Sequence, residues 1–201
     1  MLKNLNTLIR TVPPYTIYIA GALPMVWLLV LVFTNELGPD PVKALEHQLG
    51  KFGLQLLLVG LAVTPLRKFT GLNLIKFRRA FGILAFLYVS AHLLVWLVLD
   101  IQLRWGEIWA DIIKRPYITI GMVSFMLMLP LAVTSNNRAV KHMGAVGWRK
   151  LHKLTYPVTI LAAVHYVLLV KGWQIEPLVY FSAILILQIV RIRVKWANKA
   201  A

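Results

Sequence analysis

The sequence predicts an all-α, polytopic membrane protein: a bundle of six transmembrane helices with both termini in the cytoplasm. Only 14% of the 201 residues are charged and the mean hydropathy is +0.72, whereas about 25% of the residues in a soluble domain are charged. Six apolar stretches are long enough to cross a bilayer as helices. The basic residues are concentrated in alternate loops, which is the pattern of a multi-pass protein.

The predicted spans follow from the thickness of the bilayer, because a hydrocarbon core of about 30 Å requires roughly 20 helical residues. They are Tyr15–Thr34, Leu49–Leu66, Ala80–Leu99, Tyr117–Thr134, His152–Val170 and Ile175–Val190. The segment Ile101–Arg115 is amphipathic, with Trp105 and Trp109 one turn apart. It fits either a short helix on the outer surface or a loop of the aromatic belt. No linker separates the spans, so residues 1–201 are expected to form a single domain.

Lysine and arginine fix the predicted orientation. Sixteen of the 22 basic residues lie in the two tails and in the second and fourth loops: Lys3, Arg10, Arg67, Lys68, Lys76, Arg78, Arg79, Arg138, Lys141, Arg149, Lys150, Lys153, Arg191, Arg193, Lys195 and Lys199. The other six share the remaining loops with all seven acids: Lys43, Lys51, Arg104, Lys114, Arg115 and Lys171. Basic loops stay in the cytoplasm. The net charge of +15 therefore reports topology, and we expect no nucleic-acid partner.

No acid, lysine or arginine lies deep inside the predicted spans, but histidines do, and an ionisable group in a membrane helix indicates function by default. His92 lies seven residues from Leu99 and His165 lies five residues from Val170, which places them roughly 10 Å and 8 Å below the same outer surface. Two neutral imidazoles at one depth on parallel helices can bind a haem iron from both sides. The alternative is two buried histidines that are each hydrogen-bonded to a carbonyl group. A zinc or copper site would need further ligands.

His152 lies 13 residues before His165, near the cytoplasmic end of the same span. The rise of roughly 20 Å suits a second cofactor toward the inner face, although an interfacial histidine among basic residues needs no special role. The corresponding positions before His92 hold Arg78 and Arg79. Arginine stays protonated and is a poor iron ligand, but it can pair with a haem propionate or a flavin phosphate. The inner site thus lacks a second histidine, and a methionine is one substitute. His47 and His142 are expected at the surface.

Five stretches carry a family resemblance: RRAFGILAFLYVSAHLLVWLVLD, KRPYITIGM, PLAVTS, GWRKLHKLTY and HYVLLVK. They resemble the MsrQ (formerly YedZ) family, the haem-binding inner-membrane subunits of bacterial MsrPQ systems that repair methionine sulfoxide in periplasmic proteins. The resemblance extends from about Tyr15 to Lys195. It also places the chain in the ferric-reductase-like transmembrane superfamily, with the NADPH oxidases and metalloreductases.

The resemblance implies an electron-transfer subunit without catalytic residues of its own. Electrons would come from the quinone pool or a cytosolic flavin reductase, pass through haem b with FMN as a further cofactor, and reach a periplasmic MsrP-type molybdopterin subunit in a heterodimer. The implied iron ligands are His92 and His165 at the outer site and His152 at the inner site. Since Arg78 and Arg79 stand where a fourth histidine would fall, the chain would hold one haem or two. The residues do not indicate where FMN binds.

Two other functions are compatible with the residues. The first is a stand-alone quinol or ferric/metal-ion reductase, as in the wider superfamily. The second is a small transporter or an assembly scaffold. A proton- or ion-coupled transporter usually needs buried carboxylates, and no acid lies deep in the predicted spans.

Overall fold

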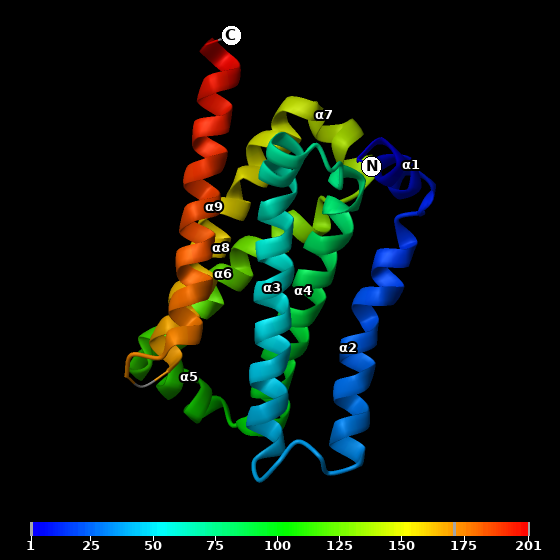
Figure 1. Cartoon of the computed structure of the whole chain (residues 1–201). Helices are drawn as coiled ribbons and strands as arrows, with labels where there is room; N and C mark the ends of the chain where they lie inside the picture. Colours follow the sequence, from blue (N-terminus) through cyan, green and yellow to red (C-terminus); the bar gives the residue numbers. More distant parts are fainter. Residues whose placement is uncertain (1, 171, 201) are drawn as a thin grey trace.

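The computed structural model is an elongated bundle of helices (Figure 1) and describes residues 2–170 and 172–200, without the side chains of 193–200. The α-helices are α1 (Leu2–Thr11), α2 (Tyr15–Phe33), α3 (Pro41–Thr70), α4 (Arg78–Leu94), α5 (Trp105–Lys114), α6 (Pro116–Val133), α7 (Asn137–Leu151), α8 (Thr155–Leu169) and α9 (Ile175–Ala200). Two 3₁₀ turns, η1 (Ile75–Phe77) and η3 (His152–Leu154), precede α4 and α8, and a π-helix, η2 (Val95–Asp100), continues α4. The side chains of Lys171, Arg193, Lys195 and Lys199, which belong to the predicted charge pattern, lie outside the described residues.

Among the described residues, five helices are long and apolar enough to cross a membrane. They correspond to five of the six predicted spans: Tyr15–Phe33, Pro41–Thr70, Ile75–Asp100, Pro116–Val133 and Ile175–Ile192. The remaining predicted span corresponds to α8, which has only 15 residues. Its first residues form the 3₁₀ turn η3 instead. Pro157 explains this start, because proline has no N–H to donate to the carbonyl group one helical turn earlier.

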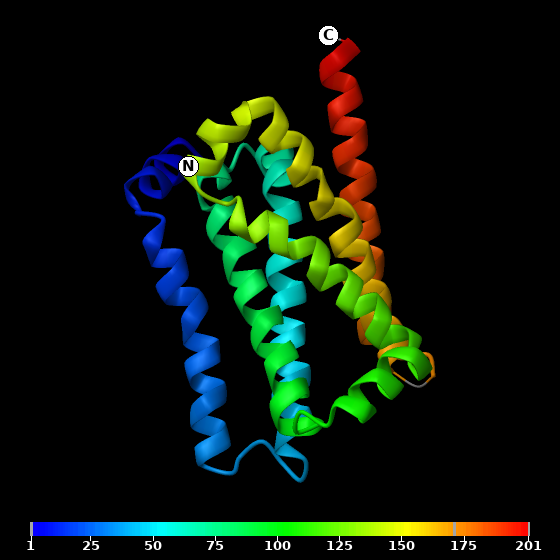
Figure 2. The same cartoon turned by 180° about the vertical axis from the view of Figure 1, so that it is seen from behind.

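The two ends of the bundle differ in charge. Helices α1 and α7 and the last turns of α9 lie at one end, and the α2–α3 loop, α5 and the α8–α9 connection lie at the other (Figures 1 and 2). All seven acidic residues belong to segments at this second end: Glu36, Asp40, Glu46, Asp100, Glu107, Asp111 and Glu176. The helix α1 and the last turns of α9 therefore lie at the end that has no acidic residue.

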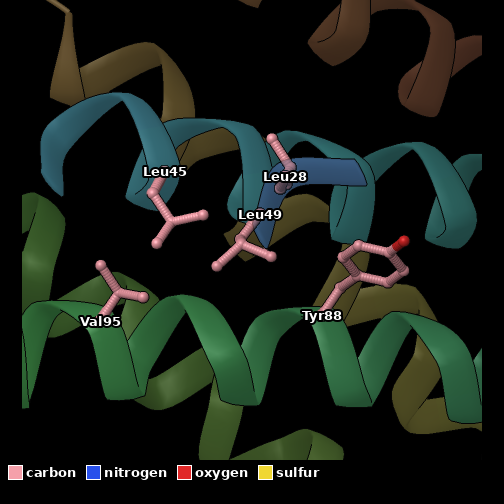
Figure 3. Packing of buried hydrophobic residues seen from close by; sticks show 5 residues of the cluster. All are labelled: Leu28, Leu45, Leu49, Tyr88 and Val95. Atoms are coloured by element: carbon pink, nitrogen blue, oxygen red, sulfur yellow. The ribbon is translucent and has the colours of Figure 1, made fainter. Parts of the chain in front are cut away.

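Helix α2 packs against the bundle through a small contact. The side chains of Leu28, Leu45, Leu49, Tyr88 and Val95 point toward one another between α2, α3 and α4 (Figure 3). The Tyr88 hydroxyl donates a hydrogen bond of 2.7 Å to the carbonyl oxygen of Gly21. Leu28 is the only buried residue of α2. The remainder of this helix presents an apolar surface of the kind that faces lipid.

Three helices lie where the sequence predicted loops or left alternatives open. Helix α5 shows that the amphipathic segment after the third span is a helix. The N-terminal tail and the basic fourth loop form α1 and α7. Both helices are amphipathic, a pattern that favours a helix although their composition is polar. Gly144, with φ of 69°, kinks α7 in the middle.

Candidate functional site

A cavity of about 540 Å³ lies between α3, α4, α6, α8 and α9, within the roughly 300–1,000 Å³ typical of ligand and cofactor sites. Apolar side chains, among them Leu54, Leu57, Val89 and Met128, form a large part of its walls. Arg115 and several other exposed residues line the mouth of the cavity, which lies at the acidic end of the bundle.

His92 and His165 both line this cavity, from α4 and α8. The centres of their rings are 6.2 Å apart and the ring planes make an angle of 78°. The sequence placed these two residues at the same depth, and the structure brings their rings together. His92 lies in the last turn of α4, three residues before the π-helix η2, an irregularity that frequently accompanies functional sites.

A backbone carbonyl group orients each ring. His92 Nδ1 lies 2.9 Å from the carbonyl oxygen of Glu46, and His165 Nδ1 lies 2.6 Å from that of Tyr117. Because a carbonyl oxygen only accepts, Nδ1 carries the proton in both rings. In a neutral imidazole Nε2 then keeps a free lone pair. This is the usual arrangement of a histidine that binds a metal, where a hydrogen bond to the other nitrogen fixes the tautomer and the ring orientation.

The spacing of the rings fits one metal ion between them. A metal–imidazole bond is about 2.0–2.1 Å long and the ring centre lies about 1.1 Å behind the bonded nitrogen, so two such ligands place their ring centres about 6.3 Å apart. The observed 6.2 Å agrees with this value. Within the described residues, no group of three or more His, Asp or Glu side chains could hold a metal ion. A metal ion held between these two imidazoles would need further ligands from elsewhere, such as the four nitrogens that a porphyrin supplies to iron.

The mouth of the cavity carries charged pairs. Lys51 pairs with Glu176 between α3 and α9, and Arg115 Nε lies 3.2 Å from Asp111 Oδ1. Lys43 lies 3.1 Å from Asp40 at the start of α3. The Lys43 backbone N–H also donates to the Asp40 carboxylate, and this hydrogen bond holds the pKa of Asp40 below its usual value.

His152 does not line this cavity. Its ring stacks on Trp148 with 3.8 Å between ring centres, and its Nε2 lies 3.1 Å from the Thr134 hydroxyl oxygen. The Thr134 hydroxyl donates its own proton to the carbonyl oxygen of Pro130 at 2.6 Å, so His152 Nε2 is the donor to Thr134. At His152 the engaged nitrogen is therefore Nε2, whereas Nδ1 is engaged at His92 and His165.

Arg78 and Arg79 lie at the start of α4, at the same end of the bundle as His152. Both are exposed, and Arg79 donates a hydrogen bond of 2.9 Å to the Asn137 side-chain oxygen. The structure thus separates the five predicted site residues into an outer pair, His92 and His165, and an inner group.

Comparison with known proteins supports a redox role. Residues 48–163 match the family described as "Ferric reductase like transmembrane component". The chain is 45% identical over 170 residues to the "Protein-methionine-sulfoxide reductase heme-binding subunit MsrQ" of Brucella ovis, Brucella abortus and Brucella suis, covering 85% of this chain and 77% of each relative. The chain belongs to the MsrQ family. No solved structure gives a significant match.

Membership of the MsrQ family and five apolar helices make this chain a multi-pass membrane protein of a redox family. Sequence reasoning alone missed the carbonyl groups of Glu46 and Tyr117, because a backbone acceptor leaves no residue signature. It also missed Thr134, although this residue lies in the PLAVTS segment that carries part of the MsrQ resemblance.

Proposed function

We propose that this chain is the haem b electron-transfer subunit of a protein-methionine-sulfoxide reductase system in the bacterial inner membrane. It takes electrons from the quinone pool or a cytosolic flavin reductase and passes them to a periplasmic MsrP-type molybdopterin subunit, with which it forms a heterodimer. The observation that supports this proposal best is the pair of imidazoles 6.2 Å apart, each with Nδ1 held by a backbone carbonyl oxygen.

His92 and His165 would hold the iron of the outer haem through their Nε2 atoms. Bound haem b supplies a one-electron couple between ferric and ferrous iron. The carbonyl groups of Glu46 and Tyr117 make the imidazoles more basic, so the histidines favour ferric iron and lower the reduction potential. The apolar side chains of the walls would exclude water from the faces of the haem, so that the site transfers electrons and not protons. No group of this chain needs to act on the sulfoxide itself.

The direction of electron flow follows from the proposed topology. Six segments cross the membrane, α8 together with η3 being the fifth, and the end with α1 and α7 faces the cytoplasm because basic residues stay inside. Electrons enter at this end, near His152, and leave through the mouth of the outer cavity. The donor, whether a quinol or a flavin protein, binds at the inner end, where Arg78 and Arg79 suit the phosphate of FMN or a haem propionate.

His152 is the one histidine ligand of a second, weaker haem site. Its Nε2 is engaged with Thr134, so binding iron requires that this hydrogen bond be broken or that the ring rotate. The outer site needs no such change. We therefore expect one tightly bound haem per chain and a second that is lost first during purification.

The test is the haem content of the purified protein. Pyridine haemochrome analysis of wild type, His92→Ala, His165→Ala and His152→Ala gives haem per chain, with the exposed His142→Ala, which lies outside the cavity, as the matched control. We expect both outer variants to lose the tight haem, and the His152 variant and the control to keep it. A colourless wild type, or unchanged haem in both outer variants, contradicts the proposal.

A stand-alone quinol or ferric/metal-ion reductase is the second candidate, and the description of the matching family favours it. The two functions differ in the electron acceptor. Reduced protein in vesicles should be oxidised much faster by the periplasmic molybdopterin partner than by ferric chelates. Equal rates with both acceptors would favour the second candidate.

A further inference from the structure

Each of the two outer histidines packs against a glycine on a neighbouring helix. The ring of His92 on α4 lies on Gly50 of α3, and the ring of His165 on α8 lies on Gly121 of α6. A carbon added at Gly50 would lie 3.1 Å from His92 Nδ1. At Gly121 it would lie 2.8 Å from His165 Nδ1 and 2.9 Å from Cε1. The two helix pairs present their glycines to the histidines in the same way.

The carbonyl group that accepts from each ring lies one helical turn before the glycine. His92 bonds to the carbonyl oxygen of Glu46, four residues before Gly50, and His165 bonds to that of Tyr117, four residues before Gly121. In a helix such a carbonyl group points toward the residue four positions later. It also keeps a second lone pair. A side chain at the glycine position would occupy the space through which the imidazole reaches this lone pair.

We propose that Gly50 and Gly121 are positioning residues for the two histidines. The missing side chains let each Nδ1 reach a helix carbonyl oxygen, and this hydrogen bond fixes the tautomer that leaves Nε2 for the iron. The inference rests on the proposed function, because it assigns the glycines to the outer haem. The inference predicts that the two glycine substitutions differ in effect. His165 lies closer to Gly121 than His92 does to Gly50, and its hydrogen bond is shorter. A methyl group at Gly121 should therefore displace the imidazole ring more than one at Gly50.

Two other helical glycines provide matched controls. Gly60 on α3 and Gly82 on α4 have no atom within 4 Å of an added carbon. Alanine at either position removes a helix-weakening glycine without touching a neighbour. Each therefore repeats the chemical change of the test variants on the same helices as Gly50 and His92, away from the rings.

The experiment compares Gly121→Ala, Gly50→Ala, Gly60→Ala and Gly82→Ala in the full chain. Low-temperature EPR of the ferric protein reports the axial ligand field, and a redox titration gives the midpoint potential. Loss of an outer-shell partner of a metal ligand commonly changes affinity tenfold or more. We expect Gly121→Ala to weaken the preference for ferric iron about tenfold, which raises the midpoint potential by about 59 mV for a one-electron couple.

Gly50→Ala should shift the EPR g-values and the potential in the same direction by less, and the Gly60 and Gly82 variants should match wild type. If Gly121→Ala does not fold, the milder Gly50→Ala still decides the question. Wild-type g-values and potential in Gly50→Ala, or in a folded Gly121→Ala, overturn the inference while leaving a haem bound by His92 and His165 intact. A wild type without haem contradicts the proposed function instead.

Discussion

Replacing Thr134 by valine should strengthen haem binding at the inner site. The Thr134 hydroxyl oxygen accepts a hydrogen bond of 3.1 Å from His152 Nε2, the nitrogen that iron would need. Valine has nearly the same shape and removes this acceptor. The Trp148 ring that stacks on His152 should stay in place, because it donates to the backbone carbonyl oxygen of Thr134 at 2.8 Å and not to the hydroxyl.

The magnitude follows from the cost of one hydrogen bond. A typical protein hydrogen bond contributes about 0.5–1.5 kcal/mol, which is the energy that His152 must give up before it binds iron. Because each 1.4 kcal/mol corresponds to a factor of ten, valine should raise the affinity of the inner site for haem by about 2- to 12-fold.

The assay is a haem titration of the purified protein, followed by the amplitude of the second, weaker binding phase. Ser135→Ala is the matched control, since the Ser135 hydroxyl donates to the carbonyl oxygen of Leu131 at 2.6 Å, four residues earlier, as Thr134 does to Pro130. We expect wild-type affinity in this control. Weaker or unchanged inner binding in Thr134→Val would refute the assignment of Nε2 as the blocked ligand atom.

Three further changes test other parts of the structure. Tyr88→Phe removes the hydrogen bond to Gly21 and should lower the free energy of unfolding by about 0.6 kcal/mol and at most about 1.7 kcal/mol, measured by denaturation in mixed micelles; no loss would mean that α2 is held by apolar contacts alone. Lys51→Gln breaks the half-exposed pair with Glu176 and should cost about 0–1 kcal/mol, so a larger loss in the same assay would indicate a further role for Lys51. Asp40→Ala removes the cap of α3 and should lower the free energy of unfolding at neutral pH. Because the folded pKa of Asp40 lies below its usual value of 3.8, the difference in stability from wild type should disappear as the pH falls through the folded pKa. A difference that does not depend on pH would contradict this cause.

Hydropathy alone predicted five helices that are long and apolar enough to cross a membrane, because the bilayer imposes their length. It did not predict their ends in water. Helix α3 begins eight residues before the predicted span, where Asp40 caps it and Pro41 is its first residue, and it ends at Gly71 with a φ of 75°. Aspartate, proline and glycine are the usual signals of helix ends, so these boundaries could have been read from the sequence.

The sequence predicted the depth of the outer site, but not the contacts that orient its two histidine rings. The rise of a helix placed His92 and His165 at one level, since depth depends only on position along the chain. Which nitrogen each ring offers depends on contacts with another helix. Gly50 and Gly121 were the available signal, because a glycine in an apolar helix often marks a close approach. The hydrogen bond between His152 in η3 and Thr134, directly after α6, joins residues 18 positions apart, and no local pattern indicates it.

The axial ligands of the bound iron test the central claim most directly. Near-infrared magnetic circular dichroism of the oxidised protein distinguishes two imidazole ligands from one imidazole and one methionine. The account predicts a bis-imidazole spectrum for the tight haem, lost in both His92→Ala and His165→Ala and kept in His152→Ala. A histidine–methionine spectrum, or a bis-imidazole spectrum that survives either outer substitution, would contradict it.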